Sequence, residues 1–220
     1  ILLPYNKYHR ENLIRENIHP SKIFCTGNTT FEVMREFAPE INDSKILSKL
    51  KLQSKNYILI TAHRSENVDN IEYFHRIIEA TGQIAKRFKC EVIYPMHPRT
   101  KSKLKNHEIS QGVRIIDPLG FYDFNHLLKE SYCVVSDSGT AAEEGIFYKV
   151  PNVSLRMATE RPETVESGAT IVSGMKLENI IESIETAVTL PWSAKYDFSD
   201  NHSPSSVVIN VIRSQITNFF

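Results

Sequence analysis

An apolar run that ends in small polar residues is the part of this sequence whose residue types and spacing best suit chemistry. Residues 134–145 read VVSDSGTAAEEG, so a buried-type strand leads into Ser138, Gly139 and Thr140, where we expect a helix to begin. The first amide N–H groups of a helix have no intrahelical acceptor and lie at the positive end of its dipole, which suits a phosphate. Glu144 follows about one and a half turns into this helix, placed to accept hydrogen bonds from sugar hydroxyls. The segment predicts a cradle for a nucleotide diphosphate, and the alternative is an ordinary turn with Ser138 as N-cap.

Further polar clusters follow other predicted strands. They supply imidazole, guanidinium and hydroxyl groups, and they occupy residues 62–67 (AHRSEN), 96–100 (MHPRT) and 156–163 (RMATERPE). Open parallel sheets bind their ligands at the carboxyl ends of the strands. We therefore expect these clusters and residues 134–145 to meet at one edge of one sheet. Pro162 is suited to the first position of a short helix in the last cluster.

Strand and helix patterns alternate along the chain. The expected strands are 23–26, 57–61, 91–95, 113–116, 132–136, 152–155 and 170–172. The expected helices are 6–17, 31–37, 39–52, about 70–88, 99–106, 122–130, 139–147, and the regions near 177–189 and 204–219. Strands separated by helices of this length imply a parallel sheet with right-handed crossovers, so the predicted fold class is α/β.

Composition and missing motifs exclude several classes of protein. Lys plus Arg and Asp plus Glu number 26 each, so no net field favours nucleic acid or an anionic membrane. The longest apolar runs are strand-sized and no signal-like segment opens the chain, so we expect no membrane span, no secretory signal and a cytoplasmic location. The cysteines lack paired spacing and read as buried free thiols. HExxH, GxGxxG and GxxxxGK[ST] are absent, so we expect no metal, no cofactor and no Walker loop.

Five ordered motifs carry a family resemblance. In order and spacing they resemble the C-terminal half of the non-hydrolysing UDP-N-acetylglucosamine 2-epimerases, and they are AHRSEN (62–67), HPRT (97–100), DPLGFYDF (117–124), SDSGTAAEE (136–144) and TERPETVESG (159–168). The similarity runs from about Tyr5 to about Phe198. The resemblance implies a Rossmann-like parallel sheet flanked by helices, the C-terminal domain of a two-domain fold like that of B-type glycosyltransferases.

The resemblance also implies a division of the chain. Residues 1–30 would be the end of the N-terminal domain or a lead-in helix and strand, residues 31–203 the UDP-binding domain, and residues 204–220 a C-terminal helix. The segment 191–203 reads as an irregular linker. The family's N-terminal domain, which carries the carboxylates thought to move the sugar's carbon 2 proton, is expected to be missing before Ile1.

The resemblance assigns the nucleotide to residues of the matching motifs. Ser138, Gly139 and Thr140 would hold the diphosphate, although many members have a second glycine where this chain has Thr140. Glu144 would bind the ribose hydroxyls, and Phe124 would border the uracil. These assignments agree with the cradle expected from the residues alone.

Catalytic and regulatory positions follow from the same resemblance. His63 matches a histidine needed for activity, near the diphosphate as an acid or a charge stabiliser. Arg161 would pair with the phosphate or the sugar, where its planar fork suits two oxygens. Arg64, Glu66 and His97 match positions that touch a second, regulatory UDP-sugar in some bacterial members.

Several of these residues also have a purely structural interpretation. His63 could be a capping or hydrogen-bonded loop histidine, and His97 could stiffen a turn before a proline. Arg161 could form a plain salt bridge to Glu160 or Glu163.

Three residues within the motifs are kept out of the predicted site. Glu143 is interpreted as a solvated charge in the N-terminal part of its helix. Phe121 and Tyr122 are interpreted as core residues, because their spacing suits packing.

The chemistry of the family explains why such a site is needed. The C–H at sugar carbon 2 has no adjacent carbonyl, so members are understood to expel UDP from carbon 1 as that proton is lost, and to add UDP back after reprotonation of the other face. Fixed donors around the pyrophosphate stabilise the leaving group and hold it for the return step. The resemblance thus implies an isomerase that interconverts UDP-GlcNAc and UDP-ManNAc in polysaccharide biosynthesis. This chain alone would bind UDP weakly with negligible turnover.

Alternative functions stay open. HPRT and DPLGFYDF are more like members that act on a UDP-2-acetamido-2,6-dideoxy-hexose in capsule and O-antigen synthesis. A UDP-sugar-binding module without catalysis and a B-type glycosyltransferase are further possibilities. The expected partners are the UDP-sugar substrate, the missing N-terminal domain and, when full length, a second copy in a homodimer.

Overall fold

The computed structural model describes residues 1–191 and 203–216. The chain divides into two compact units, a smaller one of Ile1–Ala38 with Ser199–Phe220 and a larger one of Pro39–Phe198. The larger unit carries every residue of the candidate site. The predicted linker, residues 191–203, lies almost wholly outside the described residues.

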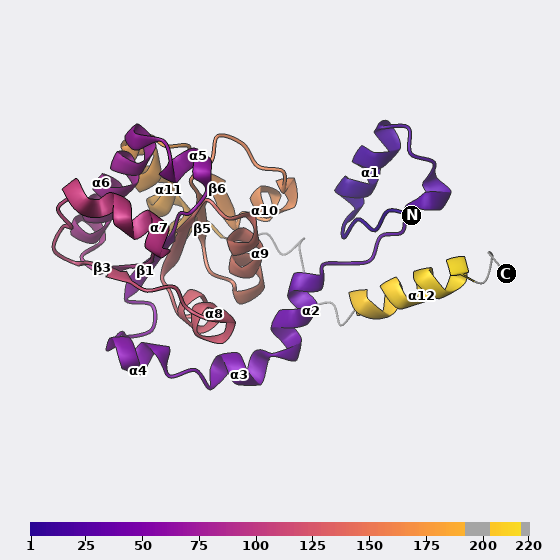
Figure 1. Ribbon diagram of the computed structural model, residues 1–220, viewed down its shortest axis with the longest axis horizontal. Helices are drawn as coiled ribbons and strands as arrows, with labels where there is room; N and C mark the ends of the chain where they lie inside the picture. Colours follow the sequence, from indigo (N-terminus) through magenta and orange to yellow (C-terminus); the bar gives the residue numbers. More distant parts are fainter. Residues whose placement is uncertain (192–202, 217–220) are drawn as a thin grey trace. The chain divides into compact units, whose positions relative to one another are not determined.

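The larger unit is built on one sheet of six parallel strands in the order β3-β2-β1-β4-β5-β6 (Figure 1). Their bounds are Tyr57–Thr61 (β1), Glu91–Pro95 (β2), Val113–Ile116 (β3), Cys133–Ser136 (β4), Asn152–Ser154 (β5) and Thr170–Val172 (β6). The predicted α/β class and the strands predicted from residue 57 onward are confirmed. The chain moves from β1 outward to β3 and returns to β4 beside β1, so strand order reverses between β1 and β4.

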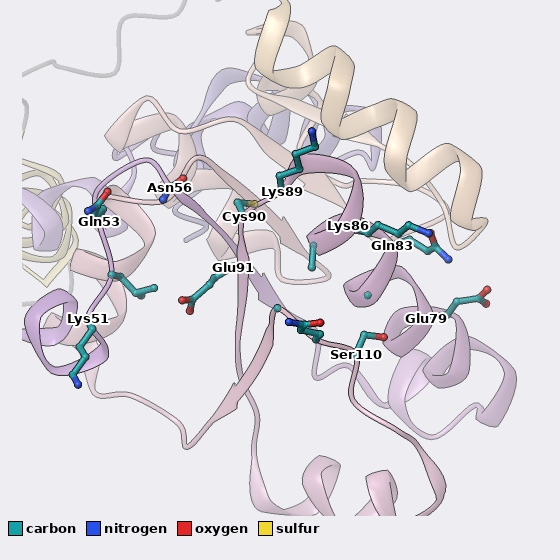
Figure 2. Close-up of a pocket in the computed structure, with 15 residues that line it drawn as sticks. Lys51, Gln53, Asn56, Glu79, Gln83, Lys86, Lys89, Cys90, Glu91 and Ser110 are labelled. Carbon is teal, nitrogen blue, oxygen red and sulfur yellow. The ribbon is translucent and has the colours of Figure 1, made fainter.

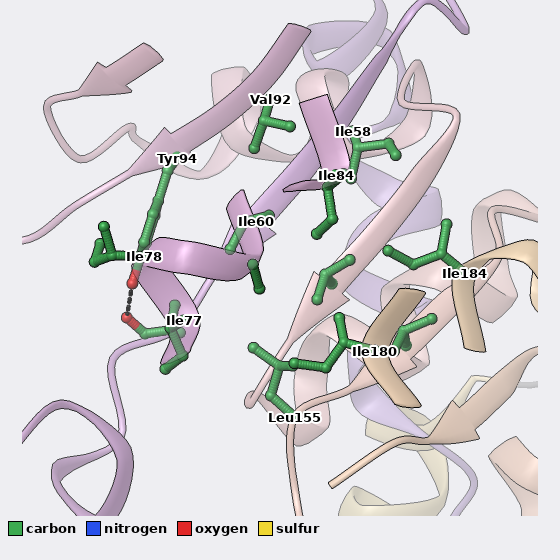
Figure 3. Close-up of a cluster of buried hydrophobic side chains, with 14 of the residues drawn as sticks. Ile58, Ile60, Ile77, Ile78, Ile84, Val92, Tyr94, Leu155, Ile180 and Ile184 are labelled. Atoms are coloured by element: carbon green, nitrogen blue, oxygen red, sulfur yellow. Dashed lines mark hydrogen bonds between the residues drawn. The ribbon is translucent and has the colours of Figure 1, made fainter. Parts of the chain in front are cut away.

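Two long helices cover one face of the sheet. They are α6 (Ile71–Phe88) and α11 (Leu177–Thr189). Figure 3 shows their isoleucines packed against strand residues that include Ile58 and Ile60. This cluster forms the larger apolar core, and it includes Tyr94, whose hydroxyl donates a hydrogen bond to the Ala62 carbonyl at 2.6 Å.

Three helices cover the opposite face. They are α4 (Ile46–Leu50), α8 (Phe121–Lys129) and α9 (Gly139–Tyr148), which pack against Tyr57 and Leu59. Successive side chains of a strand point to opposite faces, so β1 contributes alternate residues to the two cores. A five-residue strand that is buried throughout accounts for the continuous apolar run YILIT.

Helix α6 has sequence signals at both ends. The Asn70 side chain caps it by accepting a hydrogen bond from the Tyr73 amide at 3.1 Å. Lys89 ends it in the left-handed conformation, with a φ of 51°. Ile77 and Ile84 are buried on its inner side, and each such side chain contributes about 1.5–3 kcal/mol by leaving water.

The single helix predicted over residues 39–52 is wrong. The chain forms two short helices instead, α3 (Ala38–Asn42) and α4. Between them the Ser44 hydroxyl accepts from the Ile46 amide at 3.2 Å and donates to Asp123 Oδ1 at 2.5 Å. A side chain that bonds locally to the backbone competes with continued helix, which explains the break.

The remaining elements of the larger unit lie near the carboxyl ends of the strands. The predicted helix 99–106 is present as α7 (Pro98–Lys101) followed by the 3-10 helix η2 (Ser102–Asn106). The short helix α10 (Pro162–Glu166) begins at Pro162, as predicted. One further short helix, α5 (Ser65–Val68), was not expected from the sequence.

The smaller unit contains helices and one isolated bridge. Its elements are α1 (Lys7–Arg15), the 3-10 helix η1 (Pro20–Lys22), α2 (Thr29–Glu36) and α12 (Pro204–Ile216). The corresponding predicted helices are confirmed within the described residues, and residues 217–220 lie outside them. The strand predicted over 23–26 is wrong, because Ile23 makes only an isolated bridge with Leu2.

Cysteine burial differs from the prediction at one position. Cys133 is buried and Cys90 half-buried, but Cys25 is exposed, and all three are free. Cys25 lies in the segment that does not form the predicted strand, so no sheet covers it.

Within the described residues, no helix combines the length and apolar character needed to cross a bilayer.

Candidate functional site

The candidate residues lie at the carboxyl edge of the sheet, where β1 and β4 are neighbours. The loop after β1 contains His63 and Arg64, and the loop after β4 ends at Ser138, just before Gly139 begins α9. Arg161 ends the loop after β5. The strand order reverses between β1 and β4, and a crevice at such a switch point is the usual ligand position in open α/β sheets.

Asp137, directly after β4, joins the loops. Its carboxylate is fully buried, and Oδ2 accepts hydrogen bonds from the amides of His63 at 3.0 Å and Arg64 at 2.9 Å. The same oxygen accepts from Asn67 Nδ2 at 3.0 Å, and Asn67 also donates to the Leu155 carbonyl at 3.2 Å. A buried charge is stable only when it is hydrogen-bonded in this way. Asp137 therefore fixes the ends of β1, β4 and β5 to one another.

His63 has a fixed backbone and an accessible ring. Its side chain is 57% exposed, with Nδ1 at 3.7 Å from Asp137 Oδ1. That separation is too long for a hydrogen bond, so the imidazole stands beside the carboxylate without being bonded to it. The interpretation of His63 as a hydrogen-bonded loop residue holds for its backbone amide. Its imidazole ring is exposed and can contact a ligand.

The amide groups in the first turn of α9 are not capped by a side chain at the N-cap position. Ser138 is at the N-cap position, but its side chain makes no capping hydrogen bond, and its own amide donates to Ser136 Oγ at 2.9 Å. Thr140 is exposed in the first turn. The alternative with Ser138 as N-cap is confirmed in position, but the Ser138 side chain leaves the helix amides uncapped, and such amides are suited to a phosphate.

Arg161 lies across this first turn. A Cβ built on Gly139 would be 2.3 Å from Arg161 Nη1, so the guanidinium occupies the space that a side chain would need. Arg161 Nε donates to Glu143 Oε1 at 2.9 Å, and Nη1 donates to Glu160 Oε1 at 2.6 Å. The salt bridge to Glu160 was one of the structural alternatives, and it is present.

The prediction for Glu143 is wrong. Glu143 is only 5% exposed, because α9 is buried on most sides and Arg161 supplies a counter-ion. Glu143 thus holds the guanidinium from inside the fold.

Glu144 is also buried, at 7% exposed. Burial, followed by the neighbouring Glu143 carboxylate, raises the pKa of Glu144 to about 8. Its carboxyl group is therefore largely protonated at neutral pH. A protonated carboxyl both donates and accepts hydrogen bonds, which suits a pair of sugar hydroxyls.

Comparison with known proteins identifies the family. A family model described as UDP-N-acetylglucosamine 2-epimerase matches residues 1–209. The chain belongs to this 2-epimerase family. The UDP-N-acetylglucosamine 2-epimerase of Methanocaldococcus jannaschii is 34% identical over 208 residues, which cover 90% of this chain and 57% of the relative. That of Methanococcus maripaludis is 32% identical, with coverage of 91% and 57%.

Solved 2-epimerase structures share the fold. The crystal structure of the M. jannaschii enzyme in complex with UDP-GlcNAc and UDP superposes with a TM-score of 0.85 at 30% identity, covering 96% of this chain and 60% of that one. The structure from Rickettsia bellii gives a TM-score of 0.80 at 26% identity, covering 98% and 58%. The chain thus spans 57% of the length of the two curated relatives above.

Three other residues of the 2-epimerase motifs lie on neighbouring loops. Arg64 Nη1 is 3.5 Å from Glu66 Oε1, a weak contact in the loop after β1. His97 caps α7, where Nδ1 accepts from the Arg99 amide at 3.2 Å. His97 therefore stabilises the turn before α7, in agreement with its structural interpretation. It follows β2, the strand next to β1, whose loop contains Arg64.

The aromatic residues of α8 divide differently from the prediction. Phe124 packs, partly buried, against the smaller core. Phe121 and Tyr122 are 41% and 42% exposed, so their predicted core positions are wrong. They lie in the first turn of α8, before the helix packs along the sheet.

Three members of the site were not predicted: Asp137, Glu143 and Arg156. Arg156 lies directly after β5, and its Nη1 contacts Glu160 Oε2 at 2.7 Å. Asp137 could have been predicted, because a charged residue directly after a short, mostly apolar strand is expected to be buried and must then find hydrogen-bond partners. Glu143 could also have been predicted, since a helix of mostly small and apolar residues is typically buried on all sides.

A hollow with a volume of about 860 Å³ lies at the opposite, amino edge of the sheet (Figure 2). The charged ends of Lys51, Lys89 and Glu79 point away from one another there. Glu91 is paired with Arg114 at 2.8 Å. These groups do not converge on a common point, so the hollow is not a candidate active site.

Among the described residues, no group of three or more His, Cys, Asp or Glu side chains is arranged to hold a metal ion.

Proposed function

We propose that this chain is the nucleotide-binding part of an epimerase that interconverts UDP-N-acetylglucosamine and UDP-N-acetylmannosamine. The observation that carries the proposal is the first turn of α9, uncapped by Ser138 and crossed by the Arg161 guanidinium. Helix amides and a planar guanidinium are both strong donors to phosphate oxygens. The relative from M. jannaschii, whose crystal structure contains UDP-GlcNAc and UDP, supports the choice of ligand.

The nucleotide is bound by two elements in this proposal. The amides and hydroxyls of Ser138, Gly139 and Thr140 bind the diphosphate together with Arg161. Glu144, inside α9, binds the ribose hydroxyls. Its buried carboxyl group is protonated near neutral pH, so it acts first as a neutral donor and acceptor.

The remaining motif residues surround this nucleotide. His63, with its exposed imidazole, lies near the diphosphate and stabilises charge on the oxygen that leaves sugar carbon 1. Phe124 borders the uracil. Arg64, Glu66 and His97 contact a second, regulatory UDP-sugar.

The part of the reaction assigned to this chain is control of the leaving group. Fixed donors lower the barrier to departure of UDP, and they keep UDP in place for re-addition after carbon 2 has been reprotonated. The proton at carbon 2 is moved by groups of the N-terminal domain, which we propose as the necessary partner. The two domains form a B-type glycosyltransferase-like cleft, and the whole protein forms a homodimer. The free cysteines suit a cytoplasmic location.

Calorimetric titration with UDP tests the proposal. We expect saturable binding by the wild-type chain and a loss of roughly tenfold in Glu144→Ala, because ribose hydroxyls lose a buried partner. The matched control is Glu182→Ala, which removes an exposed carboxyl from α11 and should bind UDP like the wild type. Absence of saturable binding by the folded wild-type chain would overturn the proposal.

The assignment of the carbon 2 proton to the N-terminal domain gives a second test. Incubated with UDP-GlcNAc, residues 1–220 by themselves should produce no measurable UDP-ManNAc, since the groups proposed for the carbon 2 proton belong to that domain. Turnover is followed by NMR of the sugar protons, and addition of an N-terminal domain from a relative is the positive arm. Turnover by the chain alone would show that the groups for this step lie within residues 1–220.

A further inference from the structure

Arg161 is held by two carboxylates of different character. Glu143 contacts Nε from within the fold, and its side chain is 6% exposed. Glu160 contacts Nη1 from the open side, with a side chain that is 51% exposed. The inner carboxylate of Glu143 holds the guanidinium in place. The outer carboxylate of Glu160 can leave Arg161 if another cation remains paired with it.

That other partner is already in contact. Glu160 Oε2 is 2.7 Å from Arg156 Nη1, and the Arg156 side chain is only 14% exposed. Glu160 therefore bridges two guanidinium groups. Hydrogen bonding to Arg156, and then the charges of Arg156 and Arg161, lower the pKa of Glu160 to about 2, so this carboxylate stays ionised at any working pH.

The contact of Glu160 falls at the position proposed for the diphosphate. Arg161 Nη1 is the atom nearest to a Cβ built on Gly139, the first residue of α9. A phosphate bound to the helix amides would meet the same Nη1, which already donates to Glu160. Although Nη1 carries two N–H groups, two anions bound to one nitrogen would lie close together and repel each other, so a phosphate would weaken the Glu160 contact.

We propose that Glu160 is an internal competitor that tunes affinity for the diphosphate: binding exchanges the Glu160 contact on Arg161 for phosphate oxygens, and Arg156 retains Glu160. This inference rests on the proposed function. It assigns opposite effects to two residues of one loop, since Glu160 opposes the ligand and Arg156 assists it without touching it.

Titration with UDP measures the exchange. In Glu160→Gln the neutral amide competes less well for Arg161, so UDP should bind roughly two- to fivefold more tightly, the range expected for a half-exposed ion pair. In Arg156→Gln the competitor keeps its charge and loses its second partner, so UDP should bind more weakly. Glu182→Gln, on the exposed side of α11, is the control for the loss of one negative charge.

The double variant Arg156→Gln/Glu160→Gln separates exchange from a general effect of charge. If Arg156 acts through Glu160, the double variant should bind UDP as Glu160→Gln does. If each charge acts on the ligand independently, the two single effects should add. Additive effects, or weaker binding by Glu160→Gln, would overturn the exchange.

The outcomes also separate this inference from the proposed function. Saturable UDP binding by the wild type with no gain in Glu160→Gln overturns the exchange alone. Absence of UDP binding in the wild type and in all variants overturns both.

Discussion

The two edges of the sheet differ in how their polar groups are held. At the carboxyl edge Asp137 and Glu143 are buried and hydrogen-bonded, and the hollow beside Glu66 measures only about 270 Å³. At the amino edge a hollow of about 860 Å³ is lined by exposed side chains such as Lys51 and Lys89. The candidate site therefore has the smaller hollow of the two, and it differs from the larger hollow in having polar side chains fixed by buried partners.

The largest difference between the edges should appear in the free energy of unfolding when one carboxylate is removed from each edge. Asp137→Ala leaves the amides of His63 and Arg64 without their acceptor, so we expect the free energy of unfolding to fall by about 3 kcal/mol or more. Glu91→Ala breaks a half-exposed ion pair with Arg114 and should cost at most about 1 kcal/mol. Urea denaturation measures both, and equal losses would contradict the comparison.

A second difference is pH dependence. The pKa of Glu144 rises on folding from 4.5 to about 8, so the folded state binds this proton more tightly than the unfolded state. Stability contributed by this group must then fall as the pH rises between those values. From pH 6 to 9 we expect a loss of about 2–3 kcal/mol in the wild type that is absent from Glu144→Gln.

The amino edge supplies the control for that experiment. Glu79→Gln changes an exposed carboxyl that lines the larger hollow, and it should keep the wild-type dependence on pH. Urea denaturation at several pH values compares the three proteins. The same pH dependence in Glu144→Gln as in the wild type would show that another group is responsible.

The smallest expected effect is the change in UDP affinity when one cationic side chain is removed from each edge of the sheet. Arg161→Ala removes a guanidinium from the first turn of α9 and should weaken UDP binding about tenfold, the loss expected for a hydrogen bond to a charged group. Lys89→Ala removes a cation from the larger hollow and should leave the affinity unchanged. A loss of UDP binding in Lys89→Ala would move the nucleotide site to the amino edge.

Much of the larger unit could be predicted from local patterns. The strands β1, β2 and β3 were predicted with their observed bounds, because apolar runs of strand length are bracketed by polar or turn-forming residues. The same reasoning failed at 23–26, where the amides of Phe24 and Thr26 donate to the carbonyls of Leu2 and Pro4, but the pairing amounts to one isolated bridge and no strand. Pairing partners depend on tertiary structure, which local composition does not contain.

The candidate site could be predicted as a set of loops but not as a set of contacts. Motif order placed His63, Gly139 and Arg161 after β1, β4 and β5, and the structure has them there. The burial of Glu143 depends on Arg161, which comes from a different loop. The exposure of Cys25 and Phe121 likewise depends on which elements cover them. Such contacts arise only when the loops are brought together.

Hydrogen exchange of the backbone amides with and without UDP tests the central claim most directly. If the carboxyl edge binds the diphosphate, UDP should slow exchange in residues 138–142 and leave residues 82–91, at the amino edge, unchanged. Mass spectrometry of peptic peptides resolves the two segments in one experiment. Protection of 82–91 with no change in 138–142 would contradict the account.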